Sequence, residues 1–338
     1  MNYYEVTKEI DIKEYLKSIE EKCLLVYSPT SIDKNKININ KSNLKIYSTS
    51  ELTIEKETID RIITNLDEYK RVISIGGGTA TDIGKYISNK FNKELICIPT
   101  MLSTNAYSTN KVAIVVDGKK ETLDAKLPDK IFIDQNILKN SNENNLYGVA
   151  DIFSISTASN DWLLANKYNN EELTIEYDEA NKLLNETIDY VLNNDSQAIK
   201  ENQMLMYKLV GDAGEITNKF GCGRPESGSE HIFAKGLEKE IKIPHAIAVA
   251  NGIVLMLYAQ SLILDKKLDD KPYIALKKLG IYELNKKYNI SSDLITKVFM
   301  NLKPREDRYS VVNLIYKDNE LKEKIIYNYK NIITELGY

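Results

Sequence analysis

The chain has 338 residues, which is enough for two domains or for one large α/β domain. With 43% hydrophobic and 28% charged residues, its composition is that of an ordinary soluble globular protein. Lys and Arg number 45 against 49 Asp and Glu, a net charge of −4, and no clustered basic stretch appears. Because binding to nucleic acid depends on such a cluster, we expect no nucleic-acid partner.

The first 140 residues alternate short apolar runs with polar, helix-like stretches. This rhythm is typical of parallel strands joined by right-handed helical crossovers. We expect strands at 23–28, 44–48, 71–75 and 94–100, and helices at 57–66 and 81–91. Two more apolar runs, 112–116 and 130–134, are expected to pair as a hairpin or to act as returning strands.

From about residue 148 long amphipathic helices dominate, which predicts a helical bundle. The expected helices are 150–168, 170–194, 196–218, 229–239, 246–264, 270–289, 293–302 and 318–335. The polar stretch 138–148 is the expected boundary. We therefore predict an α/β domain over 1–145 and an all-α domain over 146–338.

The sequence also predicts a compartment. Cys23, Cys97 and Cys222 are widely spaced and form no CxxC pair, which indicates a reducing environment without disulfides. The first twenty residues are too charged for a signal peptide, and we find no continuous apolar run of membrane-spanning length. A cytoplasmic protein without membrane insertion is expected.

Three glycines, Gly76–Gly78, and then Thr79 lie between an expected strand and an expected helix. Backbone amides at a helix N-terminus, with no Cβ in the way, form an anion site that suits a pyrophosphate. The run is neither the GxGxxG of a standard Rossmann turn nor a P-loop, and a simple tight turn is an equal alternative. On that plainer interpretation, Asp82 and Lys85 are surface residues of the helix.

The loop after the strand expected at 94–100 is rich in hydroxyl groups. Parallel α/β folds bind ligands at the carboxyl ends of their strands, and neutral donors suit a nucleotide or a polyol. The hydroxyl residues are Thr100, Ser103, Thr104, Ser108 and Thr109. Loops without a binding role have this composition too, so the stretch supports a ligand site only together with other signals.

The two histidines of the chain, His231 and His245, lie in one short window. Neutral imidazoles commonly bind zinc or iron, and Pro244 places these two on separate elements. Asp151 offers a carboxylate from a third element, although a role as a helix-capping residue is an equal alternative. Three such ligands with a vacant position describe an open catalytic site, whereas a structural zinc has four, often sulfur. The spacing of Cys222 matches no zinc pattern.

Six segments occur in the order found in the glycerol-1-phosphate dehydrogenases, and the chain resembles that family over about residues 20–315. The segments are GGGTATDIGK, IPTMLSTNAYS, GVADIFSISTASNDWLLA, GRPESGSEH, HAIAVANGIVLM and PREDRYSVV. The most specific parts are Asp161-Trp162 and the run from Arg224 to His231. This family is part of the dehydroquinate synthase-like, iron-containing alcohol dehydrogenase superfamily.

The resemblance implies a dehydroquinate synthase-like fold, with an N-terminal Rossmann-like dinucleotide domain and an all-α C-terminal helical domain. It implies reversible reduction of dihydroxyacetone phosphate to sn-glycerol 1-phosphate with NADH or NADPH. The expected metal is zinc, with iron or nickel as alternatives, and a homo-oligomer is expected. The residues after the second strand, 48–51, do not decide between NAD and NADP.

The resemblance also assigns roles to residues of this chain by position. Asp151, His231 and His245 match the metal ligands. The implied nucleotide-binding residues are Gly76, Gly77, Gly78 and Thr79 at the pyrophosphate, Asp82 behind that loop, and Thr100 and Ser103 in the nicotinamide pocket. A hydroxyl chain such as that of Ser108 can carry the proton, because the sequence has no third histidine.

Three positions depart from the family pattern. Asn105 stands where the family has aspartate, which removes a charge near the reacting centre, and Ala246 stands where a glycine usually follows the histidine. Lys235 replaces a frequent histidine and, four residues after His231, shares its helix face. It could contact a substrate phosphate, although a solvated lysine is the plainer interpretation. Arg224, Arg305 and Arg308 are further candidates for that contact.

Other functions remain open on this sequence. The nearest alternative is dehydrogenation of glycerol or another unphosphorylated polyol. A sugar-phosphate cyclase that uses NAD transiently, as dehydroquinate synthases do, is a second alternative. A third is an inactive relative that has lost its activity through Asn105.

Overall fold

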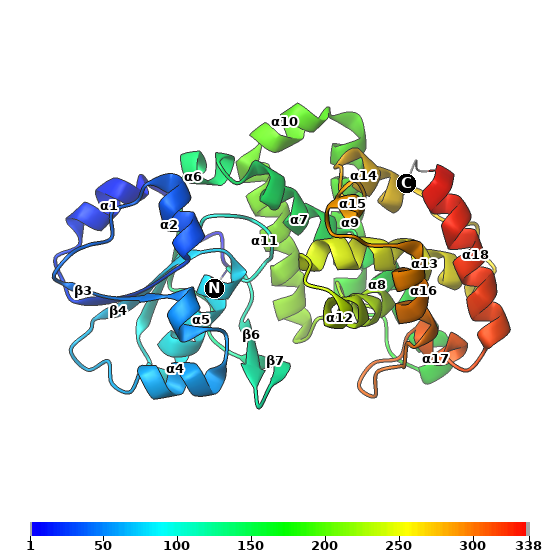
Figure 1. Cartoon of the computed structure of the whole chain (residues 1–338), viewed down its shortest axis with the longest axis horizontal. Coiled ribbons are helices and arrows are strands. Elements are labelled where there is room, and N and C mark those ends of the chain that lie inside the picture. Colours follow the sequence, from blue (N-terminus) through cyan, green and yellow to red (C-terminus); the bar gives the residue numbers. More distant parts are fainter. Residues whose placement is uncertain (1, 336–338) are drawn as a thin grey trace. The chain divides into compact units, whose positions relative to one another are not determined.

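The computed structural model describes residues 2–335, except for the side chains of residues 142–144 (Figure 1). The chain forms two compact units. The first consists of Met1–Leu146 and Lys200–Asn218, and the second of Tyr147–Ile199 and Lys219–Tyr338. The chain first changes units close to the boundary expected near residue 145. It then returns to the first unit for Lys200–Asn218, which the sequence pattern does not predict.

The first unit is built on a six-stranded sheet in which every pair of neighbouring strands is parallel. Its order is β1-β8-β5-β4-β2-β3. The strands are β1 (Thr7–Glu9), β2 (Cys23–Tyr27), β3 (Leu44–Ser48), β4 (Arg71–Gly76), β5 (Glu94–Pro99) and β8 (Lys130–Ile133). After β3 at the edge, the chain crosses to the other side of β2 to form β4. The order thus reverses between β2 and β4, where parallel sheets bind ligands.

The strands are apolar on both faces because helices cover both. The helices of this unit are α1 (Ile12–Ser18), α2 (Pro29–Asn35), α3 (Thr49–Leu52), α4 (Lys56–Ile62), α5 (Gly78–Phe91) and α6 (Gln135–Lys139). Leu25 and Ile73 face a core cluster with α1, α2 and α6, while Leu24 and Val72 face a second cluster with α3, α4 and α5. The predicted parallel α/β architecture is confirmed.

The hairpin alternative for the two last apolar runs is wrong. The run at 112–116 lies in β6 (Lys111–Val116), which pairs antiparallel with β7 (Lys119–Asp124) across the turn at Asp117-Gly118. The run at 130–134 is β8, which joins the parallel sheet next to β5. We did not expect β7, because its charged, exposed sequence KKETLD carries no strand signal.

The segment Lys200–Asn218 belongs to the first unit through α11 (Gln203–Phe220). The Tyr3 hydroxyl donates to Asp212 Oδ1 at 3.0 Å. The Tyr107 hydroxyl donates to the carbonyl of Tyr207 at 2.6 Å, and these two rings stack with centroids 4.8 Å apart. These tyrosine contacts explain why most of α11 belongs to the sheet unit and not to the helical unit.

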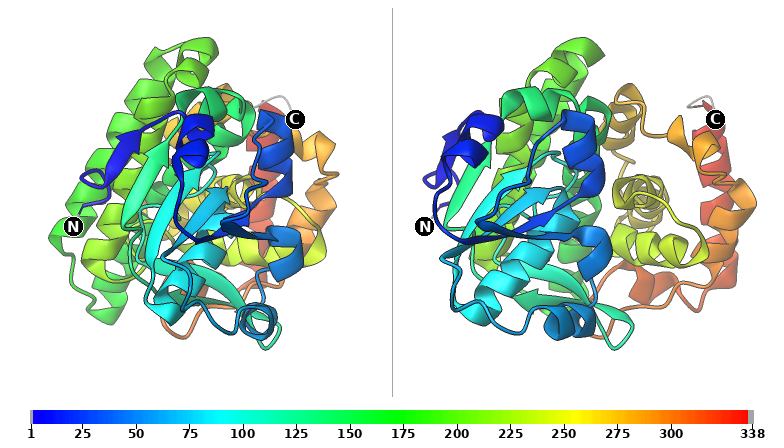
Figure 2. Two further views of the ribbon diagram at one scale, coloured as in Figure 1. Left: turned by 90° about the vertical axis from the view of Figure 1, so that its left-hand side faces the viewer. Right: turned by 60° about the vertical axis from the view of Figure 1, so that its left-hand side comes forward.

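The second unit is helical, as expected (Figures 1 and 2). It contains α8 (Ile155–Asn169), α9 (Ile175–Asn193), α12 (Ser229–Glu240), α13 (His245–Leu264), α14 (Lys271–Lys278), α15 (Leu284–Lys287), α16 (Ser292–Met300), α17 (Val311–Ile315) and α18 (Asn319–Glu335). Two further helices, α7 (Asn142–Ile152) and α10 (Ser196–Glu201), cross between the units. The short α17 carries too little periodicity to be predicted.

The centre of the helical unit is α13. By length and composition it could span a membrane, but 72% of its apolar window is buried within the protein, as in the core helix of a globular fold. In the right-hand view of Figure 2 this yellow-green helix is seen almost end-on, with orange and red helices beside it. It packs closely on α12 at Gly252, where an added Cβ would lie 2.7 Å from the carbonyl oxygen of Glu230.

Candidate metal centre

Asp151, His231 and His245 come together in the second unit. Asp151 lies near the end of α7, His231 in the first turn of α12, and His245 at the first position of α13. One ligand atom from each side chain lies within 4.8 Å of the others, and all three residues are partly buried. The His231 and His245 ring centroids are 5.0 Å apart. Three elements therefore bring two imidazoles and one carboxylate to one point.

Both imidazoles are held through Nδ1 by a carboxylate. His231 Nδ1 lies 2.6 Å from Glu230 Oε1, and His245 Nδ1 lies 2.5 Å from Glu238 Oε1. A carboxylate at Nδ1 fixes the ring orientation and the tautomer, and it increases the basicity of the other nitrogen. In both rings, Nε2 is therefore the nitrogen that would coordinate a metal.

Asp151 provides an independent test of whether the site fits a metal. Within the described part of the chain, its Oδ1 is buried and has no hydrogen-bond partner. The nearest histidine nitrogen, His231 Nε2, lies 3.8 Å away, which is too long for a hydrogen bond. A buried carboxylate oxygen without a partner is costly, and a cation would remove that cost. This donor set, with two nitrogens and one oxygen, suits a divalent zinc-like metal.

A buried polar network fixes the start of α12 beneath His231. Asp161 Oδ2 accepts from the Ser229 amide at 2.6 Å, and its Oδ1 accepts from the amide of Val311 and from Gln260 Nε2, each at 2.8 Å. Burial, and then the charge of Glu230, raise the pKa of Asp161 to about 6. Through Asp161, the network links the segments of Asp161, Gln260 and Val311 to Ser229, the residue before Glu230.

Two of the arginines considered for a substrate phosphate support the segment that leads into α12. Arg224 is buried, pairs with Glu171 at 2.8 Å, and donates to the Tyr309 carbonyl at 3.0 Å. Arg308 donates to the carbonyls of Gly223 and Ser227. Their guanidinium groups thus hold the segment before α12, and a contact between either arginine and a substrate phosphate stays a prediction.

The glycine loop lies in the first unit, where the sheet order reverses. The backbone amide of Thr100 donates to the Gly76 carbonyl at 2.9 Å, which joins the ends of β4 and β5. A Cβ at Gly76 would lie 2.9 Å from Ser28 Cβ, at the end of β2. Gly77 caps α5 without a side-chain hydrogen bond in the described chain, so amides at this helix start remain available for an anion.

Asp82 and Lys85 are buried within α5, so the interpretation as surface residues is wrong. The Lys85 ammonium donates to the carbonyl of Ala106 at 2.9 Å and also to the carbonyl of Lys111. Burial lowers the pKa of Lys85 to about 8 and raises that of Asp82 to about 6. Lys85 thus ties the loop after β5 to the helix that begins at the glycine loop.

Four comparisons with known proteins bear on this arrangement. Residues 13–141 match the family model described as iron-containing alcohol dehydrogenase. A glycerol-1-phosphate dehydrogenase [NAD(P)+] from Methanococcus aeolicus is 34% identical over 52% of this chain and 51% of that protein. The enzyme of the same name from Pyrococcus horikoshii is 26% identical over 89% of this chain and 88% of that protein.

The chain is thus similar to iron-containing alcohol dehydrogenases over residues 13–141 and to glycerol-1-phosphate dehydrogenases over most of its length. Among solved structures, the chain is similar to a probable glycerol dehydrogenase from Sinorhizobium meliloti, with a TM-score of 0.66. The two sequences are 16% identical, over 97% of this chain and 96% of the other. At this identity the likeness shows the fold alone, which agrees with the predicted one. The first relative above is matched over only about half of its length.

Most of the other predicted site residues lie in the loop after β5. Thr100 is buried, and its hydroxyl shares a 2.8 Å hydrogen bond with Ser31. Ser103 and Asn105 are partly exposed. Ser108 is buried, and its hydroxyl donates to the Asn105 carbonyl at 3.0 Å, so it shapes the loop locally. Lys235 lies on α12, and Arg305 follows α16.

The sequence did not single out Glu238, which orients His245. A signal was present, because a carboxylate seven residues before a candidate ligand can fold back when a proline ends the intervening helix. That geometry depends on the path of 241–244 between α12 and α13, and no residue pattern fixes that path.

Proposed function

We propose that this chain is a metal-dependent, NAD(P)-linked oxidoreductase that interconverts dihydroxyacetone phosphate and sn-glycerol 1-phosphate. The observation that carries the proposal is the pair of imidazoles held through Nδ1 beside Asp151 Oδ1, a buried oxygen without a hydrogen-bond partner among the described residues. The similarity to glycerol-1-phosphate dehydrogenases over most of the chain supports the substrate. We propose zinc as the metal, with iron or nickel as alternatives, and we leave open whether NAD or NADP is preferred.

The residues around the proposed metal have separate tasks. Asp151, His231 and His245 would hold the cation, which when bound supplies Lewis-acid stabilisation of an alkoxide. Glu230 and Glu238 keep both rings oriented through Nδ1. With that stabilisation, the reaction requires no protein side chain as general base.

The glycine loop is the proposed nucleotide site. Amides of Gly76–Gly78 with Thr79 would bind the pyrophosphate, because glycine allows the close approach and α5 begins there. Asp82 would support this loop from within α5, and Thr100 and Ser103 would line the pocket. Ser108 is proposed to carry the proton through its hydroxyl, and Asn105, whose carbonyl accepts from that hydroxyl, is proposed to lie near the reacting centre.

We further propose a cytoplasmic homo-oligomer that acts on a small-molecule polyol phosphate, with a nucleotide domain over 1–145 and a metal domain over 146–338. These features rest on the sequence and on the kind of relatives found.

The test combines turnover with metal content. Purified protein should oxidise NADH or NADPH with dihydroxyacetone phosphate, and His231→Ala and His245→Ala should each lose both bound metal and turnover. Lys182→Gln, on the exposed face of α9, serves as control and should retain both. Full metal occupancy in both histidine variants would refute the metal assignment.

The alternatives give different results in the same assay. Turnover of dihydroxyacetone but not of its phosphate would indicate a polyol dehydrogenase. A sugar-phosphate cyclase regenerates its cofactor, so net consumption of NADH excludes it. An inactive relative would consume no NADH with either ketone.

A further inference from the structure

Three buried hydroxyl side chains, Ser154, Ser156 and Thr157, lie at the start of α8. Each donates to the carbonyl three residues earlier in the chain, at 2.6, 2.7 and 2.8 Å respectively. Such local bonds are frequent for serine and threonine near helices and indicate no function by themselves. Ser154 and Thr157, however, each make a second contact, and both second contacts lead to the segment that carries His231.

Ser154 joins the segment that carries Asp151 to the segment that leads into α12. Its hydroxyl contacts two carbonyls, that of Asp151 at 2.6 Å and that of Glu226. The backbone amide of Ser154 also donates to the Asp151 carbonyl, at 3.1 Å. Glu226 precedes His231 by five positions. One buried hydroxyl therefore connects the backbone of one candidate ligand to the chain just before another.

Thr157 contacts the carboxylate that orients His231. Its hydroxyl donates to Glu230 Oε2, while Glu230 Oε1 accepts from the Gly228 amide at 2.6 Å and lies 2.6 Å from His231 Nδ1. Thr157 and Glu230 are both fully buried, and among the described residues Thr157 is the donor to Oε2. Removal of the hydroxyl would leave that oxygen buried without a donor, which is costly, so the carboxylate would be expected to move.

The segment before α12 lies directly against α8. A Cβ added at Gly228 would lie 2.9 Å from Ala158 Cα and 2.6 Å from Asp161 Oδ2, closer than ordinary contacts allow. The backbone at Gly228 therefore has no room to move towards α8. The hydroxyl bonds of Ser154 and Thr157 limit movement in the other direction, away from α8.

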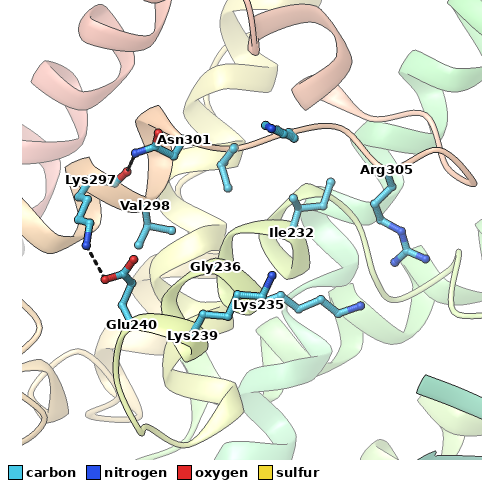
Figure 3. A pocket seen from close by; sticks show the side chains of 11 residues that line it. Ile232, Lys235, Gly236, Lys239, Glu240, Lys297, Val298, Asn301 and Arg305 are labelled. Carbon is cyan, nitrogen blue, oxygen red and sulfur yellow. Dashed lines mark hydrogen bonds and ion pairs between the residues drawn. The ribbon is translucent and has the colours of Figure 1, made fainter. Parts of the chain in front are cut away.

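A cavity of about 560 Å³ lies on another side of α12, where α16 and the loop after it complete the lining (Figure 3). Among the described residues that line it, none is a candidate metal ligand. The ion pair drawn in Figure 3 joins Lys297 to Glu240, the last residue of α12, at 2.6 Å. This ion pair holds the end of α12, whereas the first turn, with His231, depends on contacts with α8 and α13.

We propose that Ser154 and Thr157 are positioning residues for the metal centre. Ser154 sets the separation between Asp151 and the start of α12, and Thr157 holds the Glu230 carboxylate at His231 Nδ1. Both act through other residues. The proposal rests on the proposed function, because it concerns how tightly the metal of that function is bound.

Thr157→Val tests this role because it keeps the branched shape of the side chain and removes the hydroxyl. It should weaken zinc binding about tenfold to a hundredfold in competition with a chromogenic chelator, as the loss of an outer-shell partner of a ligand does. Thr157→Ser keeps the hydroxyl and should restore most of the affinity. Ser154→Ala is a second, independent variant and should also weaken zinc binding.

Ser156→Ala is the matched control. It removes a buried hydroxyl from the same helix start, but the bond of that hydroxyl is to the carbonyl of Phe153 and does not reach the segment before α12. Zinc affinity should therefore stay at the wild-type value. Melting of the metal-free proteins shows that each variant is folded before the affinities are compared.

Cobalt(II) provides a second measurement that does not depend on turnover, because its visible absorption reports the geometry of its ligands. Thr157→Val and Ser154→Ala should change the spectrum of the cobalt-loaded protein, and Ser156→Ala should not. If the wild type binds zinc while both Thr157→Val and Ser154→Ala keep its affinity and spectrum, the positioning role is refuted and the proposed function stands. If the wild type binds neither zinc nor iron nor nickel, the proposed function itself fails.

Discussion

Gly252→Ala tests whether the contact between α12 and α13 sets the metal geometry. A Cβ at this position would lie 2.7 Å from the Glu230 carbonyl oxygen and 3.0 Å from its Cα, whereas ordinary contact begins at 3.4 Å. The helices must therefore separate locally by 3.4 − 2.7 = 0.7 Å. Glu230 directly precedes His231, so the shift acts on a candidate ligand and on the carboxylate that orients it.

The expected effect on metal binding exceeds the effect on folding. Overpacking costs about 1–3 kcal/mol, and the higher helix propensity of alanine offsets about 1 kcal/mol of that. Metal–ligand distances, in contrast, tolerate only about 0.2 Å, so a shift of 0.7 Å should weaken metal binding about tenfold to a hundredfold.

The assay is competition for zinc against a chromogenic chelator, with melting of the metal-free protein as a measure of folding. Gly223→Ala is the matched control, because its Cβ would lie 3.7 Å from the nearest atom, Ser227 Cβ. Wild-type zinc affinity in Gly252→Ala would show that α12 and α13 do not set the metal geometry.

Three further changes probe other parts of the protein. Glu238→Ala should weaken zinc binding about tenfold to a hundredfold by releasing the His245 ring, measured by the same competition, and unchanged affinity would remove Glu238 from the site. Burial raises the pKa of Asp82 from 3.8 to about 6, so the folded state binds the extra proton and the free energy of unfolding should fall as pH rises through that interval. Urea unfolding at several pH values measures this slope, and Asp82→Asn should flatten it; an equal slope in the variant contradicts the assignment. Asn105→Asp should raise kcat for the phosphorylated ketone in steady-state assays. If the wild-type protein has no activity and the variant does, the chain is an inactive relative.

The sequence predicted the parallel sheet and most helices, because strands such as 71–75 are continuous apolar runs and the later helices have long amphipathic repeats. The sequence and its family resemblance also predicted Asp151, His231 and His245 as one set of candidate ligands. What it could not supply were properties set by packing. Lys85 and Arg308 have the charge of surface residues, yet backbone carbonyls from other segments surround their side chains.

The return of Lys200–Asn218 to the sheet unit has a similar cause. Amphipathic periodicity shows that a helix has an apolar face, but it does not say which unit that face will cover. Here Tyr3 and Tyr107 on the sheet side determine the partner of α11.

The buried Asp161 network also bears on the order in which the protein folds. Its carboxylate accepts from the amide of Val311, 150 positions along the chain, while all three candidate ligands have been synthesised once His245 is made. During synthesis, the ligands therefore leave the ribosome well before the segment that completes the support of α12. The hydrogen bond that completes the support of α12 can therefore form only when the chain is almost finished.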